Sequence, residues 1–405
     1  MNFEYFIAKR IARNTTGSFS GNVIKISIAA VALSVFIMII STFIVNGFQA
    51  EIEKKLFGFW GHIQVVDYNT SNFNDAVALT ENEVIVDSLK KHPNIASIHR
   101  FANKSGILKT KNGIEGIVLK GVGKDFDWSF LREKMVDGNI LEITEQDTSR
   151  MILISQTTAN RLKVKVGDPI RFYFIKKNTR GRKLKVGGIY HTGMEEYDKV
   201  YGFVDIHQIQ KLNNWAKFEI SGYELKVKDI NQLRETDEEV FKNLPLHLKS
   251  ESLLDIFPTM FDWIELTVRN KYMIMIMVII VTSLNMITVL LILILERTKM
   301  IGILKALGAS NWSIQKIFLY NITYITLWGV GIGNILALSA AYIQAKFEII
   351  PLPEKSYYLN SVPILIELKV QLMLNAIALT AIVLILFLPT LLVKNIRPIK
   401  AIRFD

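Results

Sequence analysis

The stretch that decides the fold reads ISIAAVALSVFIMIISTFIVNGFQA, residues 26–50, and it contains no charged side chain. An α-helix needs about 20 apolar residues to cross the hydrocarbon core of a bilayer, so this stretch is long enough to span it. Three further uncharged stretches, residues 272–295, 317–345 and 370–393, are also long enough. A buried helix of a soluble protein usually has about 8–20 residues and keeps a polar face. Four such stretches therefore predict a helical membrane protein with four spans.

The composition narrows the class of protein further. The chain has 405 residues, 50% of them hydrophobic and 21% charged, which argues against an intrinsically disordered protein. It has no cysteine, which excludes disulfide scaffolds, thiolate metal sites, cysteine nucleophiles and a bacterial lipid-anchored N-terminus. The first uncharged stretch exceeds the roughly 7–15 apolar residues of a signal peptide, so we interpret it as a retained anchor.

The charged residues predict how the spans are oriented. We expect the spans at 22–47, 270–295, 317–345 and 370–393. Residues 1–25, 296–316 and 394–405 each carry four basic side chains against one acidic one. Residues 346–369 have three of each sign, and residues 48–268 have 31 of each. Because cytoplasmic loops of membrane proteins are rich in Lys and Arg, both termini and the middle loop are predicted to be cytoplasmic. The net charge of +11 then marks orientation and not nucleic-acid binding.

Each segment outside the spans has a predicted structure of its own. Residues 1–21 are expected to form an amphipathic helix on the inner membrane surface, or else only a basic topology signal. Residues 48–268 are predicted to form a large α+β periplasmic domain between the first two spans. One of its hairpins is indicated by Lys111-Asn112-Gly113 between two strand-like segments. Residues 346–369 are expected to be a periplasmic loop, 296–316 a cytoplasmic loop and 394–405 a cytoplasmic tail.

A basic run in the periplasmic domain is a candidate partner-docking loop. It lies between two predicted strands, which indicates the tip of a hairpin. A solvated turn and a docking site for an acidic partner are both compatible with it. Its basic residues are Lys176, Lys177, Arg180, Arg182 and Lys183.

The sequence offers little catalytic chemistry. The segment Gly121-Val122-Gly123-Lys124 lacks the upstream glycine spacing and the following Ser or Thr of a Walker A loop. The six histidines form no HExxH pair, so we predict no metal site. Glu195, Glu196 and Asp198 are close in sequence but lack EF-hand spacing, and we interpret them as a solvated turn. No Asp, Glu, Lys or Arg lies in the middle of a span, which argues against an ion-coupled pump. We therefore expect neither catalytic residues nor a cofactor bound by this chain.

The loop between the second and third spans is the most informative segment. Met300, Ile303, Leu304 and Leu307 recur at helical spacing, and Lys299 and Lys305 lie beside them. Gly308 suits the left-handed position that ends a helix, and Ser310 suits the cap of the next helix. The pattern predicts a short surface helix with an apolar face, which could adhere to the membrane or bind a cytoplasmic protein.

The same loop carries a family resemblance. Residues 296–310 include Ile301-Gly302-Ile303-Leu304-Lys305-Ala306-Leu307-Gly308-Ala309-Ser310 and resemble the hallmark of the FtsX/MacB/LolC-LolE superfamily of ABC-transporter permeases. Residues 398–403 are similar to the C-terminal ending of that family. The stretches 6–10, 45–48, 61–63, 162–168 and 220–229 resemble the lipoprotein-releasing LolC/LolE branch.

The resemblance implies a mechanism. Family members pair two permeases, identical or paralogous, with two copies of a separate cytoplasmic ATPase that uses ATP and Mg²⁺. In the LolC/LolE branch, the ATPase is LolD-like and lipoproteins pass from the bacterial inner membrane to the periplasmic carrier LolA. The resemblance also implies that the loop helix is the coupling helix for the ATPase. Its residues would be Lys299, Met300, Ile301, Gly302, Ile303, Leu304, Lys305, Leu307 and Gly308.

Two further features of the sequence concern the branch of the family and the packing of the spans. The LolC-type subunit has a long carrier-binding hairpin, whereas the run at 176–183 is short and basic and resembles the LolE type more. Gly329 and Gly333 form a GxxxG pattern in the third span that would permit close helix packing. Two alternatives stay open: a MacB- or FtsX-like mechanotransmission permease for efflux or cell-wall hydrolase control, and a membrane-anchored receptor that uses no ATPase.

Overall fold

The computed structural model describes residues 3–13, 19–70, 77–144, 148–174 and 180–390. The chain divides into two compact units. The helical unit comprises Met1–Gln49, Ile264–Ile350 and Ser361–Asp405, and the sheet unit comprises Ala50–Trp263 and Pro351–Asn360. The predicted cytoplasmic tail at 394–405 lies outside the described residues, as do Lys176 and Lys177.

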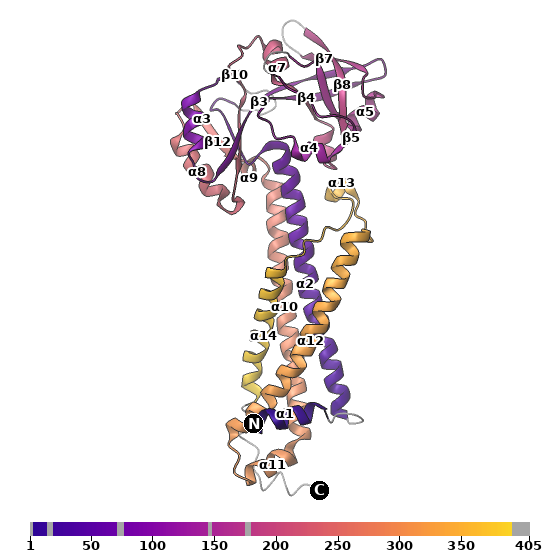
Figure 1. Ribbon diagram of the computed structural model, residues 1–405, viewed down its shortest axis with the longest axis vertical. Coiled ribbons are helices and arrows are strands. Elements are labelled where there is room, and N and C mark those ends of the chain that lie inside the picture. Colours follow the sequence, from indigo (N-terminus) through magenta and orange to yellow (C-terminus); the bar gives the residue numbers. More distant parts are fainter. Residues whose placement is uncertain (1–2, 14–18, 71–76, 145–147, 175–179, 391–405) are drawn as a thin grey trace. The chain divides into compact units, whose positions relative to one another are not determined.

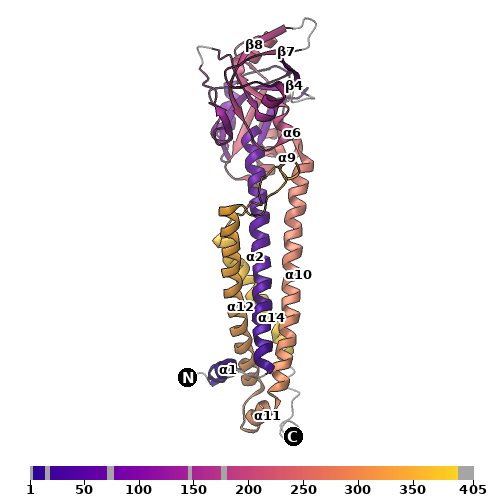
Figure 2. The same cartoon turned by 90° about the vertical axis from the view of Figure 1, so that its right-hand side faces the viewer.

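The helical unit contains long helices that run side by side in both ribbon views (Figures 1 and 2). Their inward faces share one apolar core that includes Val35, Phe43, Leu290, Phe318 and Ile325. Shorter helices lie at one end. The helices that contribute to this unit are α1 (Phe3–Arg13), α2 (Phe19–Trp60), α10 (Pro258–Glu296), α11 (Thr298–Ala306), α12 (Asn311–Phe347) and α14 (Leu368–Thr390).

Four helices of the described chain are long and apolar enough to cross a membrane. They are Gly21–Trp60, Pro258–Glu296, Asn311–Phe347 and Leu368–Phe387. Large apolar side chains on their outer faces are exposed, among them Met277 and Leu284 on α10. A bundle whose core and outer surface are both apolar suits a lipid environment.

Two of these helices are longer than the hydropathy pattern indicated. The helix α2 continues to Trp60, beyond the span end expected at residue 47, and α10 begins at Pro258, before residue 270. Charged residues such as Glu51 and Lys54 end the apolar stretch but are good helix formers, so the helix persists where the hydropathy falls. Proline is favoured in the first turn of a helix, which fits Pro258 at the start of α10.

The sheet unit is built on a ten-stranded sheet of order β12-β1-β11-β3-β4-β9-β6-β8-β5, with β7 pairing β3 and β8 off this path. The β4–β9 and β6–β8 pairs are parallel, and the other pairs are antiparallel. The strands are β1 (Ile63–Asp67), β3 (Ile95–Lys109), β4 (Ile114–Val122), β5 (Met135–Gly138), β6 (Met151–Ser155), β7 (Pro169–Phe174), β8 (Arg180–Tyr190), β9 (Tyr201–Asp205), β11 (Gly222–Val227) and β12 (Leu248–Ser252). The short strands β2 (Leu79–Thr80) and β10 (Glu219–Ile220) form a separate pair.

Helices cover and connect this sheet, so the predicted α+β character is confirmed. They are α3 (Glu83–Lys90), α4 (Ser129–Glu133), α5 (Gln156–Leu162), α6 (Glu195–Asp198), α7 (Ile206–Asn213), η2 (Ile230–Gln232), α8 (Leu233–Asn243), α9 (Leu253–Ile256) and α13 (Glu354–Tyr357). Several start at a side-chain cap typical of helix N-termini: Asn82, Ser155 and Asp205 accept hydrogen bonds from the first turns of α3, α5 and α7. The hairpin predicted around Lys111-Asn112-Gly113 is the β3–β4 pair.

The segment expected to be a free loop between the last two spans is divided between the units. Pro351–Asn360, which contains α13, belongs to the sheet unit. Hydropathy could not reveal this assignment, because the hydrogen bonds of the segment join residues far apart in the sequence.

Candidate functional site

The loop between α10 and α12 folds as the short helix α11, at the end of the helical unit that also carries α1 (Figures 1 and 2). Arg297 breaks the helical run between α10 and α11 with φ −100° and ψ 19°. The chain turns again at Gly308, whose φ of +91° is the left-handed conformation expected after a helix. Ser310 caps α12 by accepting a hydrogen bond from Ser313 N at 3.1 Å. The helix and both punctuating residues were predicted from the sequence.

The apolar face of α11 is not presented as one surface. Met300 and Leu304 pack against Ala8 of α1 and Ile317 of α12, and Ile301 and Gly302 are buried. In contrast, Ile303 is 52% exposed and Leu307 is 80% exposed. Half of the face predicted from periodicity is therefore occupied by the chain itself. Ile303 and Leu307 are the apolar residues of that face that remain for a partner.

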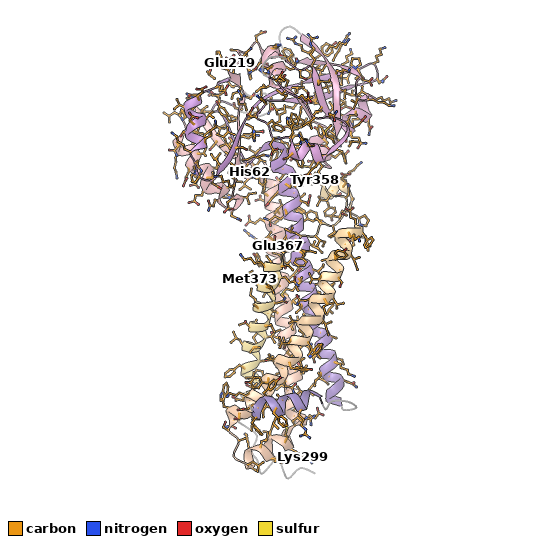
Figure 3. The ribbon with its side chains drawn as sticks, in the orientation of Figure 1. His62, Glu219, Lys299, Tyr358, Glu367 and Met373 are labelled. Atoms are coloured by element: carbon orange, nitrogen blue, oxygen red, sulfur yellow. The ribbon has the colours of Figure 1, made fainter. Side chains whose placement is uncertain are left out.

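The flanking lysines differ in their surroundings. Lys299 is exposed at the end of the helical unit (Figure 3), whereas Lys305 is half-buried. The helix α1 supports this end of the unit through polar contacts as well. Glu4 Oε1 accepts a hydrogen bond from Ser313 Oγ at 3.0 Å, and the rings of Tyr5 and Tyr320 meet edge to face with centroids 6.0 Å apart. These contacts hold α1 against the N-terminal part of α12.

Part of the predicted partner-docking loop belongs to a strand. The strands β7 and β8 pair antiparallel, with Phe174 opposite Arg180, so the run does connect two strands of a hairpin. Arg180, Arg182 and Lys183 belong to β8 and not to the tip. Arg182 and Lys183 are exposed. The strand can extend this far because these basic side chains face solvent at an exposed hairpin.

The acidic segment at 195–198 is not the solvated turn that the sequence suggested. Asp198 is fully buried, and its carboxylate accepts hydrogen bonds from Thr192 Oγ1 at 2.7 Å and Thr192 N at 3.1 Å. Burial raises the pKa of this carboxyl, which the hydrogen bonds partly oppose. Glu195 forms an ion pair with Lys199 at 2.7 Å. The segment is the short helix α6, tied into the sheet unit.

The two glycines of the third span lie where α12 packs on α2. A Cβ atom at Gly329 would approach Val31 Cβ to 2.6 Å, and one at Gly333 would approach Ala32 O to 2.6 Å. Gly331, between them in sequence, has no neighbour within 4 Å of such an atom. The close approach therefore belongs to one face of α12.

This arrangement predicts a strong positional contrast. Gly329→Ala and Gly333→Ala should each destabilise the helical unit by about 1–3 kcal/mol, because the added methyl group forces the helices apart. Gly331→Ala should be neutral or stabilising, by up to about 1 kcal/mol, since alanine favours helix. Thermal unfolding of the detergent-solubilised chain measures this order. Equal melting temperatures for the three variants would contradict the packing.

With this geometry in view, comparison with known proteins places the chain. The family model for the MacB-like periplasmic core domain matches residues 26–240, more than half of the chain, and the model for the C-terminal part of FtsX-like permeases matches residues 272–398. The chain belongs to the FtsX-like permeases with a MacB-like core domain. It is thus a multi-pass membrane permease subunit of the ABC-transporter type, as the resemblance at residues 296–310 indicated.

Individual relatives extend the similarity to nearly the whole chain. The lipoprotein-releasing system transmembrane protein LolE of Haemophilus influenzae is 23% identical over 86% of this chain and 84% of that protein. LolC of Xylella fastidiosa and LolC of Neisseria meningitidis are each 22% identical, over 100% of this chain and 98% of those proteins. Among solved structures, the periplasmic region of MacB from Actinobacillus actinomycetemcomitans is 15% identical with a TM-score of 0.35, over 49% of this chain and 91% of that one.

Proposed function

We propose that this permease is a subunit of an ATP-driven complex that extracts lipoproteins from the bacterial inner membrane and transfers them to a periplasmic carrier. The observation that carries the proposal is the similarity to LolC and LolE proteins across almost the full length of the chain. The MacB-like model alone supports only the broader class, since it matches a domain and not the whole architecture.

The topology proposed for this function follows from the charges. The basic segments at 1–25 and 296–316 favour a cytoplasmic side for α1 and α11. The sheet unit would then be periplasmic, inserted between the first and second spans. A second permease, identical or paralogous, and two copies of a LolD-like ATPase would complete the complex, with ATP and Mg²⁺ bound by the ATPase.

The energetics explain why such a subunit needs an ATPase. Burying each CH₂ group of an acyl chain in the membrane is worth about 0.8 kcal/mol, so removing a lipoprotein with two or three chains must be driven. A span region without central ionisable residues suits acyl chains better than ions. The exposed apolar pair Ile303 and Leu307 would receive the motion of the ATPase.

Depletion of the protein tests the proposal. Lipoproteins destined for the outer membrane should accumulate in the inner membrane within a few generations, as measured by membrane fractionation. Restoration by the wild-type chain controls for effects on neighbouring genes. Correct sorting in depleted cells would eliminate lipoprotein release and leave the MacB- or FtsX-like mechanotransmission role, which the MacB-like core domain favours.

A further inference from the structure

The segment Pro351–Asn360 connects α12 to α14 in the chain but belongs to the sheet unit. Leu359 is its most buried residue, with 7% exposure, and Ser356, Lys355 and Tyr357 are exposed. On one side Ser356, Tyr357 and Tyr358 line a cavity of about 530 Å³ together with Ile52, Phe257 and Trp263. Besides the burial of Leu359, polar contacts hold the segment in place.

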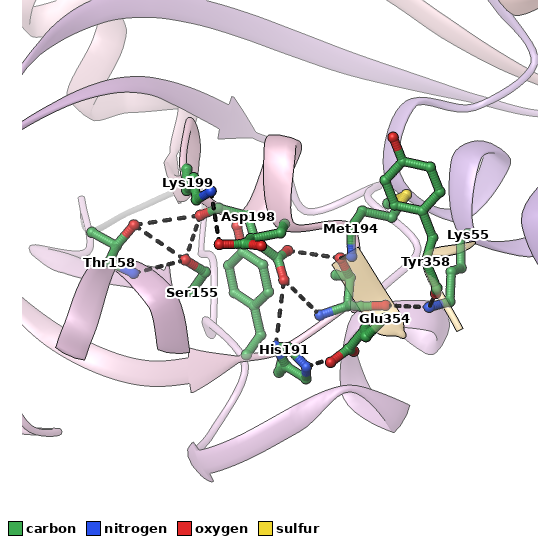
Figure 4. Close-up of polar contacts among 12 residues, drawn as sticks. Lys55, Ser155, Thr158, His191, Met194, Asp198, Lys199, Glu354 and Tyr358 are labelled. Carbon is green, nitrogen blue, oxygen red and sulfur yellow. Dashed lines mark hydrogen bonds and ion pairs between the residues drawn. The ribbon is translucent and has the colours of Figure 1, made fainter. Parts of the chain in front are cut away.

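One ammonium group makes the central polar contacts. Lys55 of α2 is 5% exposed. Its Nζ donates a hydrogen bond to Thr192 O at 2.6 Å, in the turn after β8, and another to Tyr358 O in the segment (Figure 4). A buried charge is costly unless it is well hydrogen-bonded, so these two carbonyl oxygens are what make this position tolerable for lysine. The same ammonium therefore ties α2, the turn and the segment together.

The side chain of Glu354 provides the second attachment. Its Oε1 lies 2.8 Å from His191 Nε2, and His191 Nδ1 lies 3.6 Å from the buried carboxylate of Asp198. Tyr358 Oη donates a longer hydrogen bond of 3.4 Å to Glu196. Figure 4 shows Glu354 of the segment, His191 after β8 and Asp198 of α6 next to one another.

The backbone at this junction has no space for a side chain. Gly193 has φ +81°, and a Cβ atom there would lie 2.6 Å from Glu354 Oε1 and 2.8 Å from Lys55 Nζ. Glycine is the residue that accepts both the left-handed conformation and the close approach. The turn is thus shaped to receive the segment, and the contacts are those of a built junction and not of two surfaces that happen to meet.

We propose that Lys55 is a coupling residue that keeps Pro351–Asn360 docked on the sheet unit throughout the ATPase cycle, so that displacement of α12 and α14 is transmitted to the periplasmic domain. This inference rests on the proposed function. The segment is short, and both of its ends continue directly toward spanning helices. When the segment is docked, motion of α12 and α14 moves the sheet unit. When the segment is released, it can move with these helices while the sheet unit stays in place.

The docking itself is tested without any cargo. The chain has no cysteine, so Leu359→Cys introduces a single buried thiol whose reaction with a maleimide reports release of the segment. In the full permease–ATPase complex we expect slow labelling both without nucleotide and with the ATPase trapped by vanadate. Adding Lys55→Met should raise the labelling rate about tenfold or more, because charged hydrogen bonds are lost. Glu354→Gln should raise it less.

The neighbouring lysine is a matched control. Lys54 forms an exposed ion pair with Glu133 at 2.7 Å, with both side chains more than half exposed. Lys54→Met should leave labelling unchanged, since exposed pairs contribute little. If Lys55→Met labels as slowly as Lys54→Met, or if vanadate trapping alone exposes the thiol in the wild-type background, the proposal is overturned.

Coupling is then measured in proteoliposomes that contain a triacylated lipoprotein. Lys55→Met should retain ATP hydrolysis within about twofold and release lipoprotein at least about tenfold more slowly, whereas Lys54→Met should match the wild type. Release at the wild-type rate by Lys55→Met would refute the coupling role. If the wild-type complex hydrolyses ATP but releases no lipoprotein, the proposed function fails instead, and the labelling comparison alone decides the docking.

Discussion

Lys120→Met is expected to lower the free energy of unfolding of the sheet unit by about 3–5 kcal/mol, because it leaves a buried carboxylate without its partner. Lys120 of β4 is 0% exposed and Glu224 of β11 is 2% exposed. Lys120 Nζ lies 2.7 Å from Glu224 Oε1 and donates to Phe59 O at 2.6 Å. Gln64 Nε2 donates to the same carboxylate at 3.2 Å. The ion pair between Lys120 and Glu224 is therefore buried, and both of its side chains are hydrogen-bonded.

The pH dependence of this loss has a defined sign. Burial raises the pKa of Glu224, with Lys120 opposing the shift. In Lys120→Met that opposition is gone, so the folded state binds a proton more readily than the unfolded state does. A carboxyl whose folded pKa is raised destabilises the protein above its unfolded pKa and less so as pH falls. The loss in free energy of unfolding caused by Lys120→Met should therefore be smaller at pH 5 than at pH 8.

The reciprocal variant should respond in the opposite direction. Burial lowers the pKa of Lys120, and Glu224→Gln removes the carboxylate that opposes this. Without the carboxylate, the buried ammonium of Lys120 destabilises the folded state less as it loses its proton. The loss in free energy of unfolding caused by Glu224→Gln should therefore shrink as pH rises. The double variant Lys120→Met/Glu224→Leu should be less destabilised than either single variant, because no charge is left buried.

Hydrogen exchange of β4 and β11 amides in the full chain measures these free energies, since it reports local opening directly. Lys226→Met is the control: Lys226 also lies in β11, but its ion pair with Asp127 at 2.6 Å is partly exposed. It should cost less than about 1 kcal/mol. A Lys120→Met variant no less stable than Lys226→Met would show that the buried pair contributes nothing to the fold.

This pair marks a limit of what the sequence can reveal. The sequence predicts a hairpin around Lys111-Asn112-Gly113, but nothing in the neighbourhood of Lys120 indicates that its ammonium is buried. Its partner Glu224 follows more than a hundred residues later, and the two meet because the fold places β4 and β11 in one sheet, on either side of β3. Alternation of polar and apolar residues predicts which side chains share a face of a strand, not which face is covered.

The candidate sites differ in how far local sequence patterns determine them. The helix at 298–306, its glycine stop and its serine cap follow from local rules, and all three were predicted. The docking of Pro351–Asn360 was missed, because it depends on single hydrogen bonds from Lys55 and Glu354 to residues distant in sequence. The burial of Asp198 was missed because an acidic segment most often faces solvent.

The helix α11 shows both outcomes at once. Periodicity placed Met300, Ile303, Leu304 and Leu307 on one face, but it could not show that α1 and α12 already cover part of that face. Leu304 therefore fails as a probe of an external partner, because its substitution would damage the chain's own packing. Leu307, which is 80% exposed, is free of that ambiguity.

Leu307→Asp is expected to abolish co-purification of the ATPase proposed as the partner of α11, while leaving the melting temperature of the permease unchanged. Burial of a leucine side chain at an interface is worth about 1.5–3 kcal/mol, and placing a carboxylate there adds a desolvation cost, so the affinity should fall at least about thirtyfold. Ile303→Asp should act in the same direction, and Leu307→Ala should have a smaller effect. Pull-down of a Walker A protein from solubilised membranes, quantified against the permease, provides the measurement.

Leu304→Asp is the informative contrast. It should lose the ATPase and also lower the melting temperature, since Leu304 packs against both α1 and α12 in the core at this end of the helical unit. Loss of the ATPase without loss of stability at Leu307 would then assign Ile303 and Leu307 to the interface itself. Retention of the ATPase by both Leu307→Asp and Ile303→Asp would mean that α11 is not the coupling helix, and it would favour a membrane-anchored binding module whose α11 face meets lipid.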